Sequence, residues 1–257
     1  MNDLTLSHSP RRWLLAALAV MYAVMWVGGV GGHLLTGHAP ADAMWAAPVF
    51  LLLAGLITLS GASRGEAAAL ALAAAVGLVA EIVGSKTGLI FGGYGYTDAL
   101  GPRLLAVPVV MASAWMVLVG YVREMLRPFE LSWPAEVVIA AAWMTAIDLL
   151  IDPLAAGPLG YWRWAAPGAY YGVPARNFLG WFLVSLLIFA LVKGFAERGH
   201  SRNSIAQFVG VSIIVFFALI ALAHRMILAV AVAVLLCAAH LARSFYRRQH
   251  ARRVEGA

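Results

Sequence analysis

Two aspartates stand four residues apart in the otherwise apolar stretch AIDLLIDPLAAGPLGYWRW. On a helix, Asp148 and Asp152 share one face about one turn apart. Two neighbouring carboxylates in apolar surroundings do not both ionise at low cost, so one is expected to keep its proton. An acid beside a carboxylate suits general acid–base chemistry. The structural alternatives are that Asp148 pairs with Arg163 or Arg176, and that Asp152 lies at the membrane interface, before Pro153, which is expected to end the helix.

A third acid, Glu81, lies in GLVAEIVGSKTG, about one turn before the end of an earlier apolar stretch. The expected alternation of helices brings Glu81 to the same side of the membrane as the two aspartates. Acids inside membrane segments are usually functional, and Glu81 is therefore a candidate catalytic residue beside Asp148 and Asp152. The structural alternative is an ion pair with Lys86 at the end of the same helix.

Aromatic side chains are concentrated in the two segments that follow these acids. Their π faces can line a groove for a long apolar polyene or stabilise a cation. Asn177, which follows Arg176, could bind water or orient a carboxylate, or it could cap a helix. The candidate substrate-binding residues are Phe91, Tyr94, Tyr96, Trp162, Trp164, Tyr170, Tyr171 and Asn177.

Other potentially reactive residues carry weaker signals. Trp115, Trp133 and Trp143 are expected to be ordinary interfacial tryptophans. The histidines His33, His38, His224 and His240 lie singly near the ends of apolar stretches, without a metal-binding spacing, and no glycine-rich nucleotide fingerprint follows a strand. No metal site and no cofactor are expected.

Composition places these residues in a membrane protein. The chain has 257 residues, of which 63% are hydrophobic and 12% charged, whereas soluble domains carry about 25% charged residues. Its net charge of +6 comes from short basic clusters between apolar runs, without the continuous basic face that a nucleic-acid partner would require.

Apolar stretches of about 20 residues predict transmembrane helices. Eight are expected, and seven remain an alternative if the last two form one broken element. The expected spans are 13–35, 42–60, 66–84, 104–122, 135–152, 177–195, 205–222 and 226–242. The fold class is therefore an all-α, polytopic membrane helix bundle, with residues 1–257 forming one integral membrane domain.

The basic residues predict the orientation of the bundle. With eight spans, every Lys and Arg except Lys86, Arg103, Arg163, Arg176 and Arg225 falls on the side of the two termini. The positive-inside rule then places both termini in the cytoplasm, and the chain in the cytoplasmic (inner) membrane. The two long loops, rich in Gly, Pro and aromatic residues, fall on the outer side and are expected to fold back over the bundle.

Two long stretches carry a resemblance to a known family. AEIVGSKTGLIFGGYGYTDALGPRLLAVP and DLLIDPLAAGPLGYWRWAAPGAYYGVPARNFLGW together resemble the membrane carotenoid 1,2-hydratases, of the bisanhydrobacterioruberin hydratase and γ-carotene 1′,2′-hydratase type. The ordered pattern covers about residues 78–181. It departs from the family at Ile90, where the usual motif has proline before the phenylalanine.

The resemblance implies an enzyme of carotenoid biosynthesis that adds water across the terminal C1=C2 double bond of an acyclic ψ-end, giving a tertiary 1-hydroxy group. One of Asp148 and Asp152 would donate the proton, and the other, or Glu81, would guide water. The implied partners are a lipophilic carotenoid substrate, membrane lipid and other carotenoid biosynthesis enzymes.

Two other functions fit parts of the pattern. The D-x-x-x-D spacing of Asp148 and Asp152 also occurs in intramembrane prenyltransferases and lycopene elongases, but a second such motif is missing and few basic residues lie nearby to hold a diphosphate. Intramembrane acids also suit a proton-coupled transporter, but the two halves of the chain show no inverted repeat.

Overall fold

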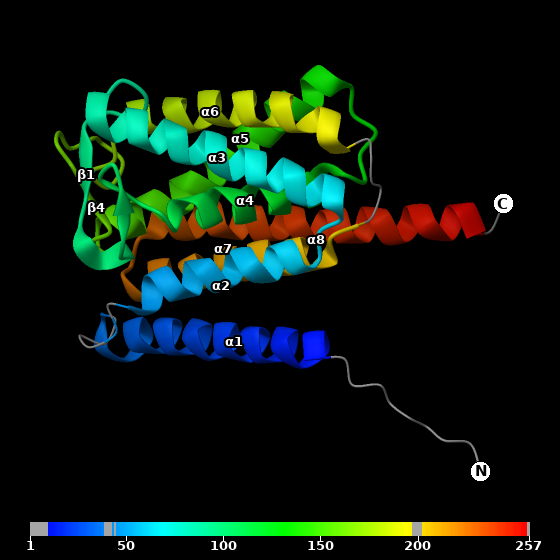
Figure 1. Ribbon diagram of the computed structural model, residues 1–257, viewed down its shortest axis with the longest axis horizontal. Helices are drawn as coiled ribbons and strands as arrows, with labels where there is room; N and C mark the ends of the chain where they lie inside the picture. Colours follow the sequence, from blue (N-terminus) through cyan, green and yellow to red (C-terminus); the bar gives the residue numbers. More distant parts are fainter. Residues whose placement is uncertain (1–9, 39–42, 44, 197–201, 256–257) are drawn as a thin grey trace, which may run out of the picture.

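The apolar stretches of the sequence form eight α-helices in the computed structural model, which describes residues 10–38, 43, 45–196 and 202–255. Successive helices run in opposite directions through the bundle (Figure 1). Their bounds are α1 Pro10–Thr36, α2 Ala46–Ser60, α3 Arg64–Thr87, α4 Met111–Leu126, α5 Trp133–Ala156, α6 Ala175–Ala196, α7 Ser204–Ala223 and α8 Ile227–Glu255.

Six of these helices are long and apolar enough to cross a membrane, counted over the described residues. The two others, α2 and α4, have 15 and 16 residues, slightly fewer than the roughly 17–25 that a transmembrane helix uses. The chain is thus a multi-pass membrane protein.

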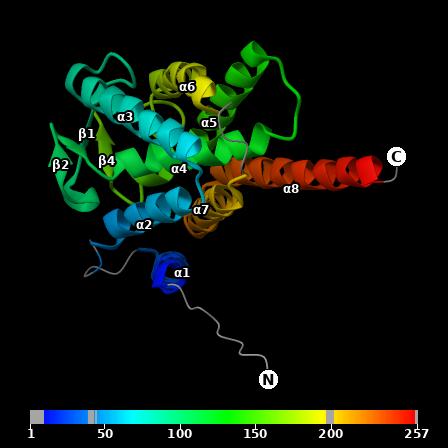
Figure 2. The ribbon, with the colours of Figure 1, turned by 45° about the vertical axis from the view of Figure 1, so that its right-hand side comes forward.

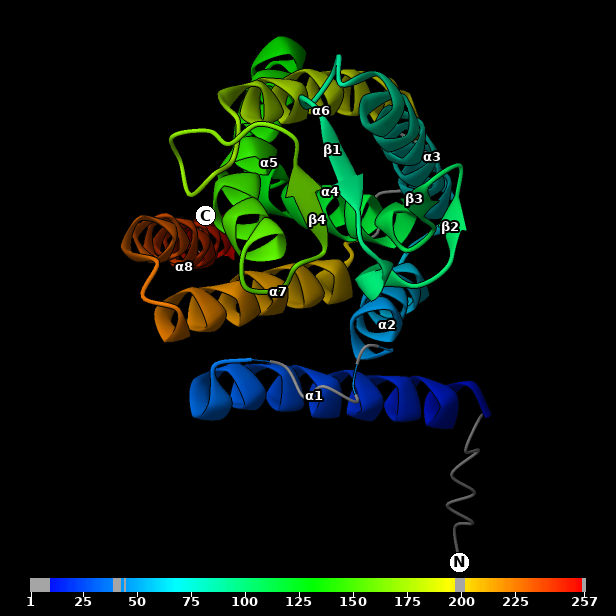
Figure 3. The same cartoon turned by 90° about the vertical axis from the view of Figure 1, so that its left-hand side faces the viewer.

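Four helices, α3, α4, α5 and α6, form a ring in which each contacts the next. Figure 3 looks onto one end of this ring, where two short strands cross it. Helices α2, α7 and α8 pack around the ring, and α1 lies at the edge of the bundle against α2 and α7 (Figures 1 and 2).

Local signals fix the ends of α3, which carries Glu81. The Ser63 side chain accepts a hydrogen bond from the backbone N–H of Glu66, as expected of the S-x-x-E spacing. At the other end, Gly88 adopts the left-handed conformation, with φ of 65°, and its N–H bonds to the carbonyl of Gly84. Glu81 is therefore held about two turns before a defined helix end.

The two long loops contain short strands, which the sequence patterns did not predict. Strand β1 (Tyr94–Tyr96) pairs antiparallel with β4 (Trp162–Trp164), and this ribbon joins the loop after α3 to the loop after α5. Between β1 and α4, the 3-10 helix η2 (Asp98–Leu100) precedes a small hairpin of β2 (Arg103–Leu104) and β3 (Val107–Pro108).

The fourth expected span, 104–122, was therefore wrong at its start, because α4 begins only at Met111. Leu105 and Ala106 form the turn of the hairpin with positive φ angles of 49° and 75°. Proline at 108 biases the preceding residue towards extended backbone, so the apolar run cannot continue as helix through this point.

The expectation that Pro153 ends its helix was also wrong, because α5 continues to Ala156 with Pro153 inside it. Proline has no N–H to donate, which leaves the carbonyl of Leu149, four residues earlier, without its helical partner. The hydroxyl of Tyr170 donates to that carbonyl at 3.0 Å. The second aromatic loop thus supplies the missing hydrogen bond.

The limits of the last two expected spans and of the second expected span can also be compared with the helices. The last two expected spans are distinct helices, α7 and α8, joined by a tight turn in which Arg225 has a φ of 56°; the count of eight helices is confirmed. The first residues of the expected span 42–60 lie outside the described residues, and α2 begins at Ala46.

Candidate functional site

The three acids lie buried at one end of the ring of helices. Glu81 comes from α3, and Asp148 and Asp152 come from α5; their exposed fractions are 4%, 2% and 1%. Glu81 lies close enough to both aspartates to interact with them electrostatically. The sequence-predicted acids therefore form one cluster.

Asn177 joins the two aspartates. It is the third residue of α6 and is itself 2% exposed. Its side-chain N–H₂ donates to Oδ2 of Asp148 at 2.7 Å and to Oδ2 of Asp152 at 2.5 Å. An amide carries two N–H donors, so one side chain serves both carboxyl groups and holds them side by side. Its position inside the first turn makes it a link between helices and not the cap of α6.

Glu81 accepts hydrogen bonds from three aromatic side chains. The hydroxyls of Tyr94 and Tyr96 donate to Oε2 at 2.5 and 2.8 Å, and the indole N–H of Trp115 donates to Oε1 at 3.2 Å. Burial, and then the charge of Glu81, raises the pKa of both tyrosines above the usual value. Both therefore keep the protons that they donate.

The β1–β4 ribbon places the loop aromatics over this cluster. In its register Tyr94 lies opposite Trp164 and Tyr96 opposite Trp162, with ring centroids 5.2 and 5.8 Å apart. Alternate residues of a strand share a face, so all four rings lie on one side of the ribbon. Trp162 also donates its N–H to Oδ1 of Asp152 at 2.9 Å.

The three acids take their hydrogen bonds from side chains other than the basic residues considered as alternative partners. Among the described residues, the carboxylate of Glu81 bonds to aromatic donors and not to Lys86. Arg176 donates to the carbonyl of Leu89. The aspartates take their hydrogen bonds from Asn177 and Trp162 instead.

Three predicted binding residues lie outside this cluster. Phe91 is wedged between α3 and α6, where a Cβ on Gly84 or Gly180 would lie only 2.6–2.7 Å from its ring. Tyr170 bonds to α5, as described above, and the Tyr171 hydroxyl accepts from the backbone N–H of Leu228 at the start of α8, at 3.0 Å. These contacts tie loops and helices together.

A cavity of about 560 Å³ adjoins the cluster, within the size range of small-molecule sites. Side chains of α1, α2, α4, α5, α6, α7, η2 and the loop after α5 line it. Its lining is mostly apolar, and Asp148 is the one carboxylate among the described residues that face it. Trp162 also lines the cavity, whereas Asp152, Glu81 and Asn177 are not among its lining residues.

Two side-chain contacts at or near the cavity were not predicted from the sequence. Trp115, expected at the membrane interface, is instead fully buried and stacks on Trp181, which lines the cavity, with ring centroids 4.2 Å apart. His33 also lines the cavity and bonds through Nδ1 to Nε2 of His224 at 3.0 Å. These two histidines are 191 residues apart, so only the packing of α1 against α7 pairs them.

Comparison with known proteins identifies the family of the chain. Residues 43–240 match the family model described as "Carotenoid biosynthesis protein". The chain is also 31% identical, over 136 residues, to bisanhydrobacterioruberin hydratase of Haloarcula japonica; the match covers 48% of this chain and 43% of the relative. No solved structure matches.

Proposed function

Because this chain belongs to the carotenoid biosynthesis protein family, we propose that it is a carotenoid hydratase, which adds water to the terminal C1=C2 bond of an acyclic ψ-end. Its role is carotenoid modification, and the name of the Haloarcula relative supports hydration as the reaction. The observation that carries the proposal is Asp148, a buried acid in the wall of an otherwise largely apolar cavity.

The first step is protonation of the alkene. The protonated carboxyl of Asp148 gives its proton to C2, and the π electrons of the double bond form the new C–H bond. A tertiary cation remains at C1. Asp152, held beside Asp148 by Asn177, disfavours a second negative charge at this place, so one proton is retained in the resting pair.

The second step is capture of the cation by water. Water forms a C–O bond at C1 and releases one proton to the carboxylate pair, which restores the resting state. The net change is addition of one water molecule, without oxidation or reduction. The rings of Trp162 and Trp181 line the cavity, and their faces can stabilise the developing cation.

Glu81 acts in this scheme as a fixed charge behind the aspartates. Its three hydrogen bonds from Tyr94, Tyr96 and Trp115 occupy both carboxylate oxygens. Such a carboxylate is a poor proton donor to the cavity, but its negative charge favours retention of a proton by the aspartate pair and stabilises a nearby cation. We therefore assign the acid role to Asp148 and an electrostatic role to Glu81.

The test is pigment analysis by liquid chromatography and mass spectrometry in cells that make lycopene. The wild-type chain should yield a product heavier by one water, and Asp148→Asn should reduce its formation by about a hundredfold or more. Asp98→Asn is the matched control, because its side chain is 93% exposed and pairs with Arg103 at the same end of the protein.

The amount of each variant protein in the membrane is measured in parallel, so that poor membrane insertion is not mistaken for a loss of catalytic activity. Absence of any hydrated pigment from the wild type, across several acyclic carotenoids, would refute the proposal. A product enlarged by an isoprenyl group, formed only with Mg²⁺, would indicate prenyl transfer instead.

A further inference from the structure

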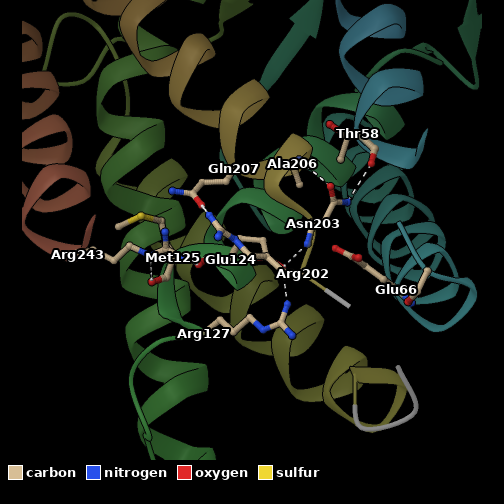
Figure 4. A network of polar contacts seen from close by, with 11 residues as sticks. Thr58, Glu66, Glu124, Met125, Arg127, Arg202, Asn203, Ala206, Gln207 and Arg243 are labelled. Carbon is tan, nitrogen blue, oxygen red and sulfur yellow. Dashed lines mark hydrogen bonds and ion pairs between the residues drawn. The ribbon is translucent and has the colours of Figure 1, made fainter. Parts of the chain in front are cut away.

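A second polar cluster lies at the end of the bundle opposite the three acids. It gathers side chains from the ends of α2 and α4, from the starts of α3 and α7, and from the middle of α8 (Figure 4). The hydration scheme uses none of them. Its charged members among the described residues are Glu66, Arg123, Glu124, Arg127, Glu136, Arg202, Arg243 and Arg247.

One part of this cluster fixes helix ends. Glu124 is 4% exposed, and its Oε1 accepts from the backbone N–H of Asn203 at 3.1 Å and from Arg127 at 3.2 Å. Arg243, 3% exposed, donates to the backbone carbonyls of Glu124 and Met125 at the end of α4. These carbonyls have no partner within their own helix, so Arg243 has a structural task.

Among the described residues, the arginines of this cluster outnumber its acids. Five arginines each lie in electrostatic range of at least one other arginine, whereas the acids in range of them are Glu66, Glu124 and Glu136. Arg202, exposed just before α7, donates a hydrogen bond to the side chain of Gln207. Partial desolvation of its guanidinium, and next the charge of Arg247, lowers the pKa of Arg202. Clustered guanidinium groups of this kind favour a bound anion.

The neighbouring surface lies at the level where lipid headgroups begin. The apolar part of α8 that is suited to cross the membrane ends at Arg247. Just before it, Leu241 and Phe245 are 58% and 61% exposed. Phe129 and Tyr246 stack with ring centroids 5.2 Å apart, and aromatic residues are enriched at the membrane–water interface.

We propose that Arg127, Arg202 and Arg247 form a binding site for the phosphate of an anionic phospholipid. The acyl chains would lie along the exposed apolar surface of α8, which leads directly to Arg247. This continuity favours a lipid over a free phosphate ion, because soluble phosphate would gain nothing from Leu241 and Phe245. Arginine is suited to the task, since its planar guanidinium can bind two phosphate oxygens at once.

The site is tested on the full-length chain purified in detergent. It is titrated with phosphatidylglycerol, with phosphatidylcholine and with soluble glycerol phosphate, and bound lipid is counted by native mass spectrometry. Wild-type protein should bind phosphatidylglycerol more tightly than phosphatidylcholine or glycerol phosphate. Each substitution Arg127→Gln, Arg202→Gln or Arg247→Gln should weaken that binding by about fivefold, the effect of about 1 kcal/mol per basic residue near a charged membrane surface.

Arg64→Gln is the matched control. It removes one exposed arginine at the same end of the bundle, at the start of α3, outside the three-arginine site, and should leave binding unchanged. Equal weakening by Arg64→Gln would mean that only net charge matters and would overturn the site. Binding of glycerol phosphate as tight as that of the lipid would overturn the lipid assignment. If the variant with all three substitutions still binds phosphatidylglycerol more tightly than phosphatidylcholine, both the site and the lipid assignment are overturned.

Discussion

The residue that decides the arrangement of the acids is Asn177. Two buried carboxyl groups repel each other when both are charged, and each needs hydrogen-bond donors to offset the loss of water. One amide nitrogen supplies a donor to each aspartate. A serine hydroxyl has one donor and could serve only one of them, and a lysine would neutralise the pair by its charge. Asparagine therefore keeps two acids together without neutralising them.

Replacement of Asn177 by alanine should reduce hydration by about ten- to hundredfold, because hydrogen bonds to charged groups contribute about 1.5–3 kcal/mol. The measurement is product formed per amount of folded protein in membranes. Asn203→Ala is the matched control: Asn203 is equally buried but caps α7 at the other end of the bundle. It should lower thermal stability and leave the rate per folded molecule unchanged. Full activity of Asn177→Ala would exclude a role for the amide in the chemistry.

At the scale of elements, α5 and the loop after it depend on each other. Pro153 follows the catalytic candidate Asp152 and deprives the Leu149 carbonyl of its helical donor, and Tyr170 replaces that donor. Burial raises the pKa of Tyr170 to about 12, so its hydroxyl remains a donor at any physiological pH. The proline thus couples the aspartate-bearing turn to the loop through one hydrogen bond.

A double-mutant cycle measures this coupling. In the wild-type background, Tyr170→Phe should lower the free energy of unfolding by about 1 kcal/mol, since it removes the hydrogen bond to a partly buried carbonyl. In the Pro153→Ala background the new N–H can bond to Leu149, and the same substitution should cost less. Thermal unfolding in detergent gives the four values. Equal costs in both backgrounds would show that Tyr170 acts independently of the proline.

At the scale of the whole molecule, the two ends have different chemistry. One end carries the β1–β4 ribbon, seen in Figure 1, with the three acids beneath it, and the other carries the cluster of Figure 4. Because the helices alternate in direction, α1 begins and α8 ends on the side of the arginine cluster. The positive-inside rule predicts that this end faces the cytoplasm. The substrate end group would then be hydrated near the outer face of the membrane.

Labelling of single cysteines tests this orientation in intact cells. In a Cys237→Ser background, Gly95→Cys lies on the exposed β1 strand at the acid end and Arg64→Cys is exposed at the arginine end. A maleimide that does not cross membranes should label Gly95→Cys only, and both should react after the cells are opened. Labelling of Arg64→Cys alone in intact cells would reverse the orientation and place the acids in the cytoplasmic half.

The sequence by itself determined the class of protein and the end at which each acid lies, and it predicted eight helices with seven as the alternative. Apolar length and the alternation of helix direction are properties of the chain read in order, so they needed no packing. They were enough to predict that Glu81, Asp148 and Asp152 share one side. The expected span 66–84 also falls within α3, whose ends in the structure are capped at Ser63 and Gly88.

Only the tertiary structure decided how the helices are rotated and what the loops contact. A membrane helix is apolar towards lipid and towards its neighbours, so its periodicity does not reveal which face is inward. The bridge from Asn177 to both aspartates, the burial of Trp115 and the His33–His224 pair depend on that rotation. The β1–β4 ribbon likewise joins three-residue segments far apart in the chain, which are too short to carry a strand pattern.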